Sequence, residues 1–159
     1  MTGLRKQESI NTFNLIIKLS QQNRLSEYYV SATEILEHFR FPELFLRQTK
    51  KVYISIVASE LISEIERSSE VSHSAIKKRL AKNKQNLRFK ELRSYFATYL
   101  RQHGILAEYI DLLQGRIPKS VFAKHYLKIE SLKELVQKVN TVTSTIESSL
   151  LSLCRIRHT

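Results

Sequence analysis

Several residue types and patterns are nearly absent from this chain of 159 residues. It has one cysteine, Cys154, which excludes an internal disulfide and fits a reducing cytoplasm. It has three glycines, and none stands in a GxGxxG or GxxxxGKS pattern, so no glycine-rich loop for a nucleotide phosphate is predicted. Five histidines are present without metal-ligand spacing, and we expect no metal site and no cofactor. They are His38, His73, His103, His125 and His158.

Long apolar segments are absent as well. No run of eighteen apolar residues occurs, so the sequence predicts no membrane-spanning helix. The N-terminus also lacks the apolar stretch of a secretion signal. A membrane location is therefore disfavoured, and we expect a cytoplasmic protein.

What the chain has in excess is positive charge. Its 26 lysines and arginines face 15 aspartates and glutamates, which gives a formal net charge of +11. An excess of this size predicts a polyanionic partner, either nucleic acid or an anionic membrane surface. Since the membrane is disfavoured, we expect nucleic acid, and hence association with the nucleoid.

The length corresponds to one domain, and apolar periodicity predicts mainly helices. Alternation of apolar and polar residues over 52–56 predicts one small β-hairpin that turns near 48–51. The spacing of Ser131 and Glu134 is that of a capping box, and it opens an amphipathic C-terminal helix over 131–153. The other predicted helices cover residues 10–17, 31–39, 59–67, 75–103 with a break near 83–86, and 106–113.

Basic residues gather on two of these predicted helices. Lys90 and Arg93 lie three positions apart and therefore project from one helix face, as a phosphate clamp requires. Taken alone, such positions are more often a solvated helix face. Five more basic residues precede them, and we expect these to contact DNA phosphates without reading the base sequence. They are Lys77, Lys78, Arg79, Lys82 and Lys84.

Three further positions are ordinary by themselves. Arg5 follows a tight Gly3–Leu4 turn, and Lys50 lies at the tip of the predicted hairpin. Tyr126 follows a break at Gly115, and most tyrosines fill half-buried structural positions. The order of these residues along the chain is more informative than any one of them.

Five short segments, in this order, resemble the conserved elements of the tyrosine recombinases, the phage-integrase family. "TGLRKQE" at 2–8 resembles the first arginine box, and "RQTKK" at 47–51 is similar to the hairpin lysine segment. "FKELRSYFATYL" at 89–100 resembles the second arginine box, and "LLQGR" at 112–116 the Leu-Gly-His element. "HY" at 125–126 falls where that family has its nucleophilic tyrosine.

Two departures narrow the resemblance. Lys90 stands where most members have histidine, and Arg116 stands where most have histidine or tryptophan. The integrases of archaeal spindle-shaped viruses carry the same substituted set. The segment "EYIDLLQGR" at 108–116, followed by Pro118, resembles that branch as well.

The resemblance implies the catalytic domain of a tyrosine recombinase, with the fold of the DNA breaking-rejoining enzymes, over residues 1–159. It implies site-specific integration of a viral or plasmid element through double-stranded attachment sites. Arg5, Arg93 and Arg116 would hold the scissile phosphate, since a guanidinium binds two oxygens and keeps its charge. Lys50, with Lys51 as the alternative, would protonate the leaving 5′ oxygen.

In the same resemblance Tyr126 is the nucleophile that forms a covalent 3′-phosphotyrosine, which conserves the bond energy without ATP or a metal. Lys90 is expected to contact the phosphate electrostatically, because a lysine is protonated at neutral pH. Glu8 would orient Arg5. His125 is adjacent to Tyr126, but the sequence leaves open which group removes the phenol proton.

The family resemblance also leads to expectations about oligomeric assembly and about which domains the chain contains. The apolar face of 131–153 either closes the domain's own core or docks on a neighbouring subunit in a tetramer on DNA. The first box begins at residue 2, so we expect the chain to lack the N-terminal DNA-clamping domain and the first helices of the catalytic domain.

Two other functions remain open from the sequence. A type IB topoisomerase-like enzyme would share the phosphotyrosine chemistry, and an inactive basic DNA-binding remnant would share only the charge. A metal-dependent transposase is disfavoured, because no acidic triad is evident and carboxylates are few.

Overall fold

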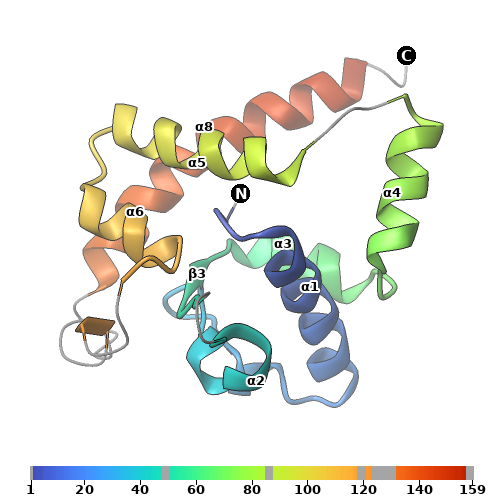
Figure 1. Ribbon diagram of the computed structural model, residues 1–159, viewed down its shortest axis with the longest axis horizontal. Helices are drawn as coiled ribbons and strands as arrows, with labels where there is room; N and C mark the ends of the chain where they lie inside the picture. The colour runs from blue at the N-terminus through green and yellow to red at the C-terminus, as the bar shows by residue number, and fades with distance from the viewer. Residues whose placement is uncertain (1, 48–50, 85–87, 118–120, 123–131, 157–159) are drawn as a thin grey trace.

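A computed structural model gives the fold, and it describes residues 2–47, 51–84, 88–117, 121–122 and 132–156, with side chains as far as Ile146. Most of these residues are helical, and a small antiparallel sheet completes the fold (Figure 1). The predicted class, mainly α with a small β element, is therefore confirmed. The longer helices are α1 (Lys6–Gln21), α3 (Ser59–Glu66), α4 (His73–Lys82), α5 (Phe89–Gln102), α6 (Ala107–Leu113) and α8 (Lys133–Ile156).

The short elements lie between α1 and α3. They are the 3-10 helices η1 (Leu25–Glu27) and η2 (His38–Arg40), the four-residue helix α2 (Pro42–Phe45), and the strands β1 (Tyr29–Val30), β2 (Ile35–Leu36) and β3 (Ser55–Ile56). The strands follow one another in the sheet in the order β1-β2-β3, and both pairings are antiparallel.

The helix predicted over 31–39 is wrong. Residues 31–34 are instead the turn between β1 and β2, in which the amide of Thr33 donates to the carbonyl of Val30 at 3.1 Å. Glu34 adopts a φ of 53°, which a helix excludes. The Ser31 and Glu34 spacing imitated a capping box, but burial of Ile35 and Leu36 on the two faces of a strand decides the conformation.

The predicted hairpin is confirmed only in part. Leu46 and Lys51 form an antiparallel bridge, so the chain does reverse between them, while residues 48–50 lie outside the described part. The segment before the turn is the helix α2 and not a strand. The alternating segment after it pairs through β3 with β2.

Two apolar cores lie on opposite faces of the sheet. Ile35 belongs to a core with residues of α5, α6 and α8, whereas its neighbour Leu36 belongs to a core with residues of α1, α2 and α3. Adjacent strand residues point to opposite faces, which explains the division. In Figure 1, α5, α6 and α8 accordingly lie together, and α1, α2 and α3 form a second group below them.

The C-terminal helix α8 packs on the first of these cores. Leu132, directly before the helix, and Leu135 and Val139 belong to that core, and Ile146 further along the helix is buried as well. This part of the predicted apolar face thus closes the chain's own core. Ser131 and the side chains beyond Ile146 lie outside the described part, so neither the predicted capping box nor contact with another subunit is visible there.

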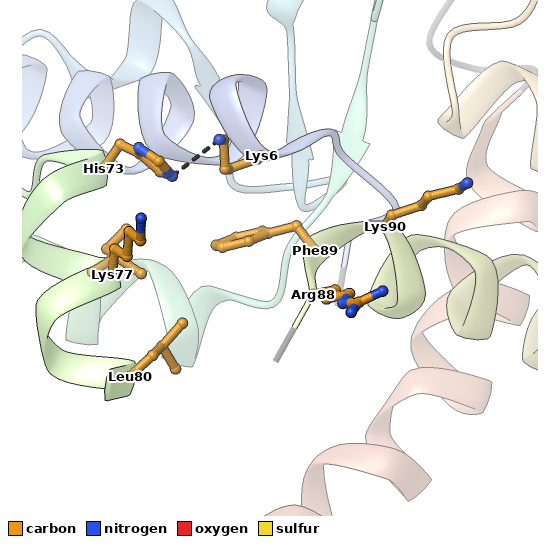
Figure 2. A pocket seen from close by; sticks show the side chains of 8 residues that line it. Lys6, His73, Lys77, Leu80, Arg88, Phe89 and Lys90 are labelled. Carbon is orange, nitrogen blue, oxygen red and sulfur yellow. Dashed lines mark hydrogen bonds between the residues drawn. The ribbon is translucent and has the colours of Figure 1, made fainter. Parts of the chain in front are cut away.

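Helix α4 differs from the other long helices in that none of its residues is buried. It lies at the edge of the molecule and faces the beginnings of α1 and α5 across a pocket (Figures 1 and 2). The predicted break in 75–103 is confirmed, because α4 ends at Lys82 and α5 begins at Phe89. The basic side chains of α4 are therefore free of any role in the core.

Candidate functional site

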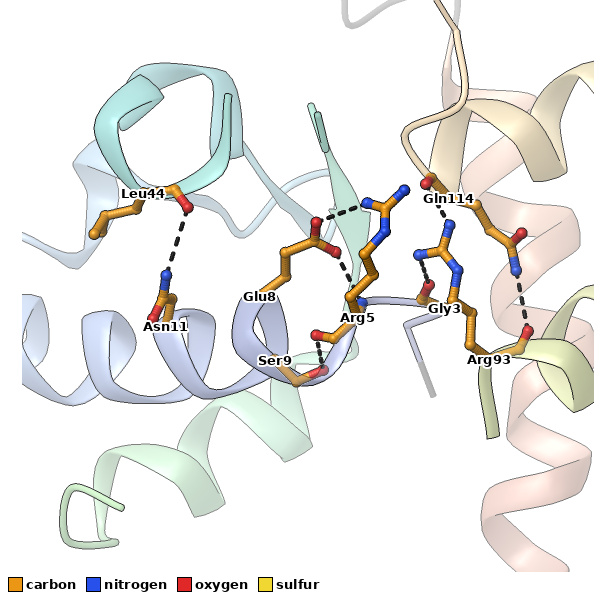
Figure 3. A network of polar contacts seen from close by, with 8 residues as sticks. All are labelled: Gly3, Arg5, Glu8, Ser9, Asn11, Leu44, Arg93 and Gln114. Carbon is orange, nitrogen blue, oxygen red and sulfur yellow. Dashed lines mark hydrogen bonds and ion pairs between the residues drawn. The ribbon is translucent and has the colours of Figure 1, made fainter. Parts of the chain in front are cut away.

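The first arginine is positioned by the start of α1. Its backbone N–H donates to Oε2 of Glu8 at 2.8 Å, and its Nη1 donates to Oε1 of the same carboxylate at 2.7 Å (Figure 3). The side chain of Glu8 is 1% exposed, whereas that of Arg5 is 28% exposed. A buried carboxylate thus holds both the helix end and the guanidinium, while Arg5 keeps part of its surface for a ligand.

The second arginine joins three segments of the chain. Nη1 of Arg93 donates to the carbonyl oxygen of Gly3 at 2.7 Å, and its Nη2 donates to the carbonyl oxygen of Gln114 at 2.6 Å (Figure 3). Nε2 of Gln114 donates to the carbonyl oxygen of Arg93 at 3.0 Å. Both acceptors of the guanidinium are neutral, so these bonds fix its orientation without cancelling its charge.

The charges of the arginines act on one another. The pKa of Arg93 is lowered to about 10, first by burial and then by the positive charge of Arg5. Arg116 lowers it further, and Glu8 partly opposes the shift. Arg93 remains protonated at neutral pH, and the guanidinium groups of Arg5 and Arg116 both lie within electrostatic reach of it. An oxyanion between them would relieve their mutual repulsion.

The third arginine is placed by the close contact of a glycine with the hairpin. Gly115 has a φ of 61°, and a Cβ atom there would lie 1.5 Å from the carbonyl oxygen of Lys51. Only glycine fits this contact, which sets the backbone of Arg116 beside the strand that follows the hairpin turn. The Arg116 side chain is 56% exposed and its Nη1 lies 3.3 Å from Oδ1 of Asp111.

The predicted Lys90 faces the same site. A pocket of about 340 Å³ is lined by Arg5, Lys6, Phe89, Lys90 and Arg93. The structure thus brings three of the predicted residues, Arg5, Lys90 and Arg93, around one hollow. Arg116 lies close enough to Arg93 for its positive charge to lower the pKa of Arg93. Their catalytic roles stay predictions.

Lys50, His125 and Tyr126 lie outside the described residues. The described chain resumes at Lys51, whose backbone lies against Gly115.

The predicted DNA-contacting residues lie on and just after α4. Lys77, Lys78, Arg79 and Lys82 are exposed on the helix, and Lys84 follows it with a φ of 53°. They do not share one face. Lys78, Arg79 and Lys82 line a hollow of about 630 Å³, whereas Lys77 lines the pocket of Figure 2.

Sequence reasoning missed three residues of this region. Gln114 is fully buried and bonded to Arg93, and its place directly before Gly115 in "LLQGR" was the available signal. Lys6 and His73 lie 3.0 Å apart, from Nζ to Nε2, although 67 positions separate them. No local sequence pattern predicts a contact between residues so far apart in the chain.

Two negative observations hold for the described residues. Among them, no group of three or more histidine, cysteine, aspartate or glutamate side chains is arranged to hold a metal ion. None of the helices in the described ranges is long and apolar enough to span a bilayer.

Comparison with known proteins gives one match. A family model described as archaeal phage integrase matches residues 13–140. Neither the curated proteins nor the solved structures contain a significant match to the chain. The matched range contains Lys90, Arg93 and Arg116, and it covers most of the chain.

Proposed function

The chain belongs to the archaeal phage integrase family, and from this premise we propose that it cleaves and rejoins DNA through a covalent 3′-phosphotyrosine intermediate. The family assignment itself indicates a DNA integrase that acts as a site-specific recombinase. The finer chemistry is our proposal. Its main support is the arginine cluster, in which Arg5 and Arg116 each repel the part-buried Arg93.

The clamp is suited to the charge that develops during phosphoryl transfer. A phosphodiester attacked by a phenolic oxygen accumulates negative charge on its non-bridging oxygens. Arg5 and Arg93 are held in place by Glu8 and by two backbone carbonyls, so little reorganisation accompanies the reaction. Fixed donors of this kind contribute about 2.7–4 kcal/mol each to the stability of a transition state.

The remaining roles follow the family likeness. The oxygen of Tyr126 attacks phosphorus, the bond to the 5′ oxygen breaks, and Lys50 supplies the proton that the leaving oxygen takes up. Lys90 lines the same pocket as Arg5 and Arg93, which supports an electrostatic contact with the phosphate. His125 is the neighbouring candidate for receiving the phenol proton.

The wider surface supplies affinity for DNA. We assign the exposed cations of α4 to contacts with backbone phosphates on either side of the cleaved position. Integration joins two DNA sites, and we propose that it proceeds in a tetramer assembled on DNA. The C-terminal part of α8, beyond the segment that packs in the chain's own core, is the segment we assign to subunit contact.

A nicked suicide duplex tests the chemistry. Cleavage next to the nick releases a short 5′-hydroxyl fragment, so religation fails and the covalent complex accumulates. We expect a protein–DNA adduct that survives denaturing electrophoresis with the unaltered chain and is lost in Tyr126→Phe. The adduct should contain a 3′-phosphate linkage and leave a free 5′ hydroxyl.

The same assay separates the alternatives. Strand exchange between two duplexes that carry the attachment sequence identifies a recombinase, whereas relaxation of any supercoiled plasmid without exchange identifies a topoisomerase-like enzyme. No adduct at saturating protein, despite tight DNA binding, contradicts the proposal and leaves a DNA-binding remnant.

A further inference from the structure

A second basic pocket lies beside the arginine cluster. It has a volume of about 380 Å³ and is bounded by α1, α4 and α5 (Figure 2). Its polar lining consists of Lys6, His73, Lys77, Arg88 and Lys90, and none of its described lining residues is acidic. The apolar side chains of Ile76, Leu80 and Phe89 complete the wall.

One hydrogen bond holds two sides of this pocket together. Nζ of Lys6 lies 3.0 Å from Nε2 of His73 (Figure 2). An ammonium group has only donors, so Nε2 of His73 is the acceptor of this hydrogen bond. Lys77 lies four positions after His73 and therefore on the same face of α4. The ammonium groups of Lys6 and Lys77 thus face one small volume from two different helices.

The positive charge of the pocket comes from its side chains. Lys6, His73 and Phe89 line it and are the first residues of α1, α4 and α5 respectively. The starts of α1 and α4 are already capped, because Glu8 accepts from the N–H of Arg5 and Oγ of Ser72 accepts from the N–H of Ala75. An anion in the pocket would therefore be bound by the lysine side chains.

The position of the pocket relative to the arginine cluster indicates which anion. Lys6, Phe89 and Lys90 line both this pocket and the one that contains Arg5 and Arg93. The two pockets therefore adjoin. If one phosphate of a DNA strand is bound at the arginines, a neighbouring phosphate of that strand is the nearest anion for this pocket.

We propose that the pocket between α1, α4 and α5 binds the backbone phosphate next to the one that is cleaved, with Lys6 and Lys77 as its joint ligands. The identity of the anion rests on the proposed function, whereas the site itself rests on the lining residues. His73 is a positioning residue, because it holds the ammonium of Lys6 at the pocket.

A double-mutant cycle on DNA affinity tests the site. Fluorescence anisotropy with a short labelled duplex is measured in a Tyr126→Phe background, so that cleavage plays no part. We expect Lys6→Ala and Lys77→Ala each to weaken binding about tenfold, and the double variant to weaken it by little more than either alone. Each single variant should also lower the slope of log affinity against log salt by about 0.9.

Lys78→Ala is the matched control. It removes the same charge from the next position of α4, which lines a different hollow. The losses from Lys6→Ala and Lys78→Ala should multiply, since these lysines contact separate phosphates. A loss of about 100-fold in Lys6→Ala/Lys77→Ala, equal to the product of the single losses, overturns the shared site, as does unchanged affinity in both single variants.

His73 needs a readout that distinguishes positioning from folding. His73→Gln keeps an oxygen that accepts a hydrogen bond from Lys6 and should retain most of the affinity, whereas His73→Phe should lose as much as Lys6→Ala. In the Lys6→Ala background the two His73 variants should bind DNA equally. A difference that persists there means that His73 acts independently of Lys6.

A last experiment distinguishes binding of a DNA phosphate in the pocket from binding of free inorganic phosphate. Thermal unfolding is followed with inorganic phosphate for the unaltered chain and for Lys77→Ala. If phosphate stabilises only the unaltered chain while Lys77→Ala leaves DNA affinity unchanged, the pocket binds a free anion and the DNA assignment is wrong. None of these measurements requires the suicide-duplex adduct, so the site and the proposed chemistry can fail separately.

Discussion

Arg93 and Gln114 hydrogen-bond each other in both directions. Nη2 of Arg93 donates to the carbonyl oxygen of Gln114 at 2.6 Å, and Nε2 of Gln114 donates to the carbonyl oxygen of Arg93 at 3.0 Å. The pair ties α5 to the segment that follows α6, directly before Gly115 and Arg116. These two hydrogen bonds therefore set the backbone at Arg116 relative to the guanidinium of Arg93.

The first prediction concerns Arg93. Arg93→Ala should lower cleavage of a suicide duplex at least about 100-fold, because a fixed donor to the phosphate is lost. DNA affinity should fall less than about threefold, since many other cations contact the backbone. Arg101→Ala, an exposed position on the same helix, is the control and should leave cleavage unchanged. Parallel loss of binding and cleavage would make Arg93 a general DNA contact.

The second prediction separates backbone strain from steric overlap. Gly104 and Gly115 both have positive φ, 79° and 61°, but a Cβ at Gly104 meets nothing within 4 Å. Gly104→Ala should cost about 1–2 kcal/mol of unfolding free energy. Gly115→Ala adds overlap with the Lys51 carbonyl and should cost about 2–5 kcal/mol. Urea unfolding measures both, and equal costs would contradict the close contact.

The third prediction concerns pH and the buried His38. Nδ1 of its ring lies 2.6 Å from Oη of Tyr28 and Nε2 lies 2.8 Å from Oγ of Ser55, and burial lowers the pKa of His38 to about 3. The unfolded chain has a histidine pKa near 6.5, so between these values the unfolded state binds more protons. Stability should therefore fall as pH drops below about 6.5, by about 1.4 kcal/mol per pH unit from this group.

The control for this pH effect is His38→Gln, which lacks the titrating ring. It should be less stable at pH 7.5, because the buried hydrogen bonds are disturbed, but it should lose less stability between pH 7.5 and 5. Identical losses in the two proteins over this interval would show that His38 does not cause the pH dependence.

The fourth prediction concerns metal ions. Cleavage should be unaffected by EDTA, because arginines and a lysine neutralise the phosphate and a side chain is the nucleophile. A magnesium-dependent nuclease, assayed in the same buffer, confirms that chelation is complete. Activity that returns only with added magnesium would contradict the phosphotyrosine mechanism.

Local patterns predicted much of the helical framework. The helices predicted within 75–103 and the break near 83–86 were correct, because helix periodicity depends on neighbours a few positions away. The failure at 31–39 arose where a helix signal competed with strand burial, and burial depends on residues elsewhere in the chain.

The sequence alone determined the family, the helical class and the types of residue that meet a phosphate, since these depend on composition, short motifs and local periodicity. Only the tertiary structure decided that Arg93 reaches the carbonyl of Gly3, 90 positions away, and that Lys6 meets His73. Such contacts follow from how the helices pack around the two cores, and no segment carries that information by itself.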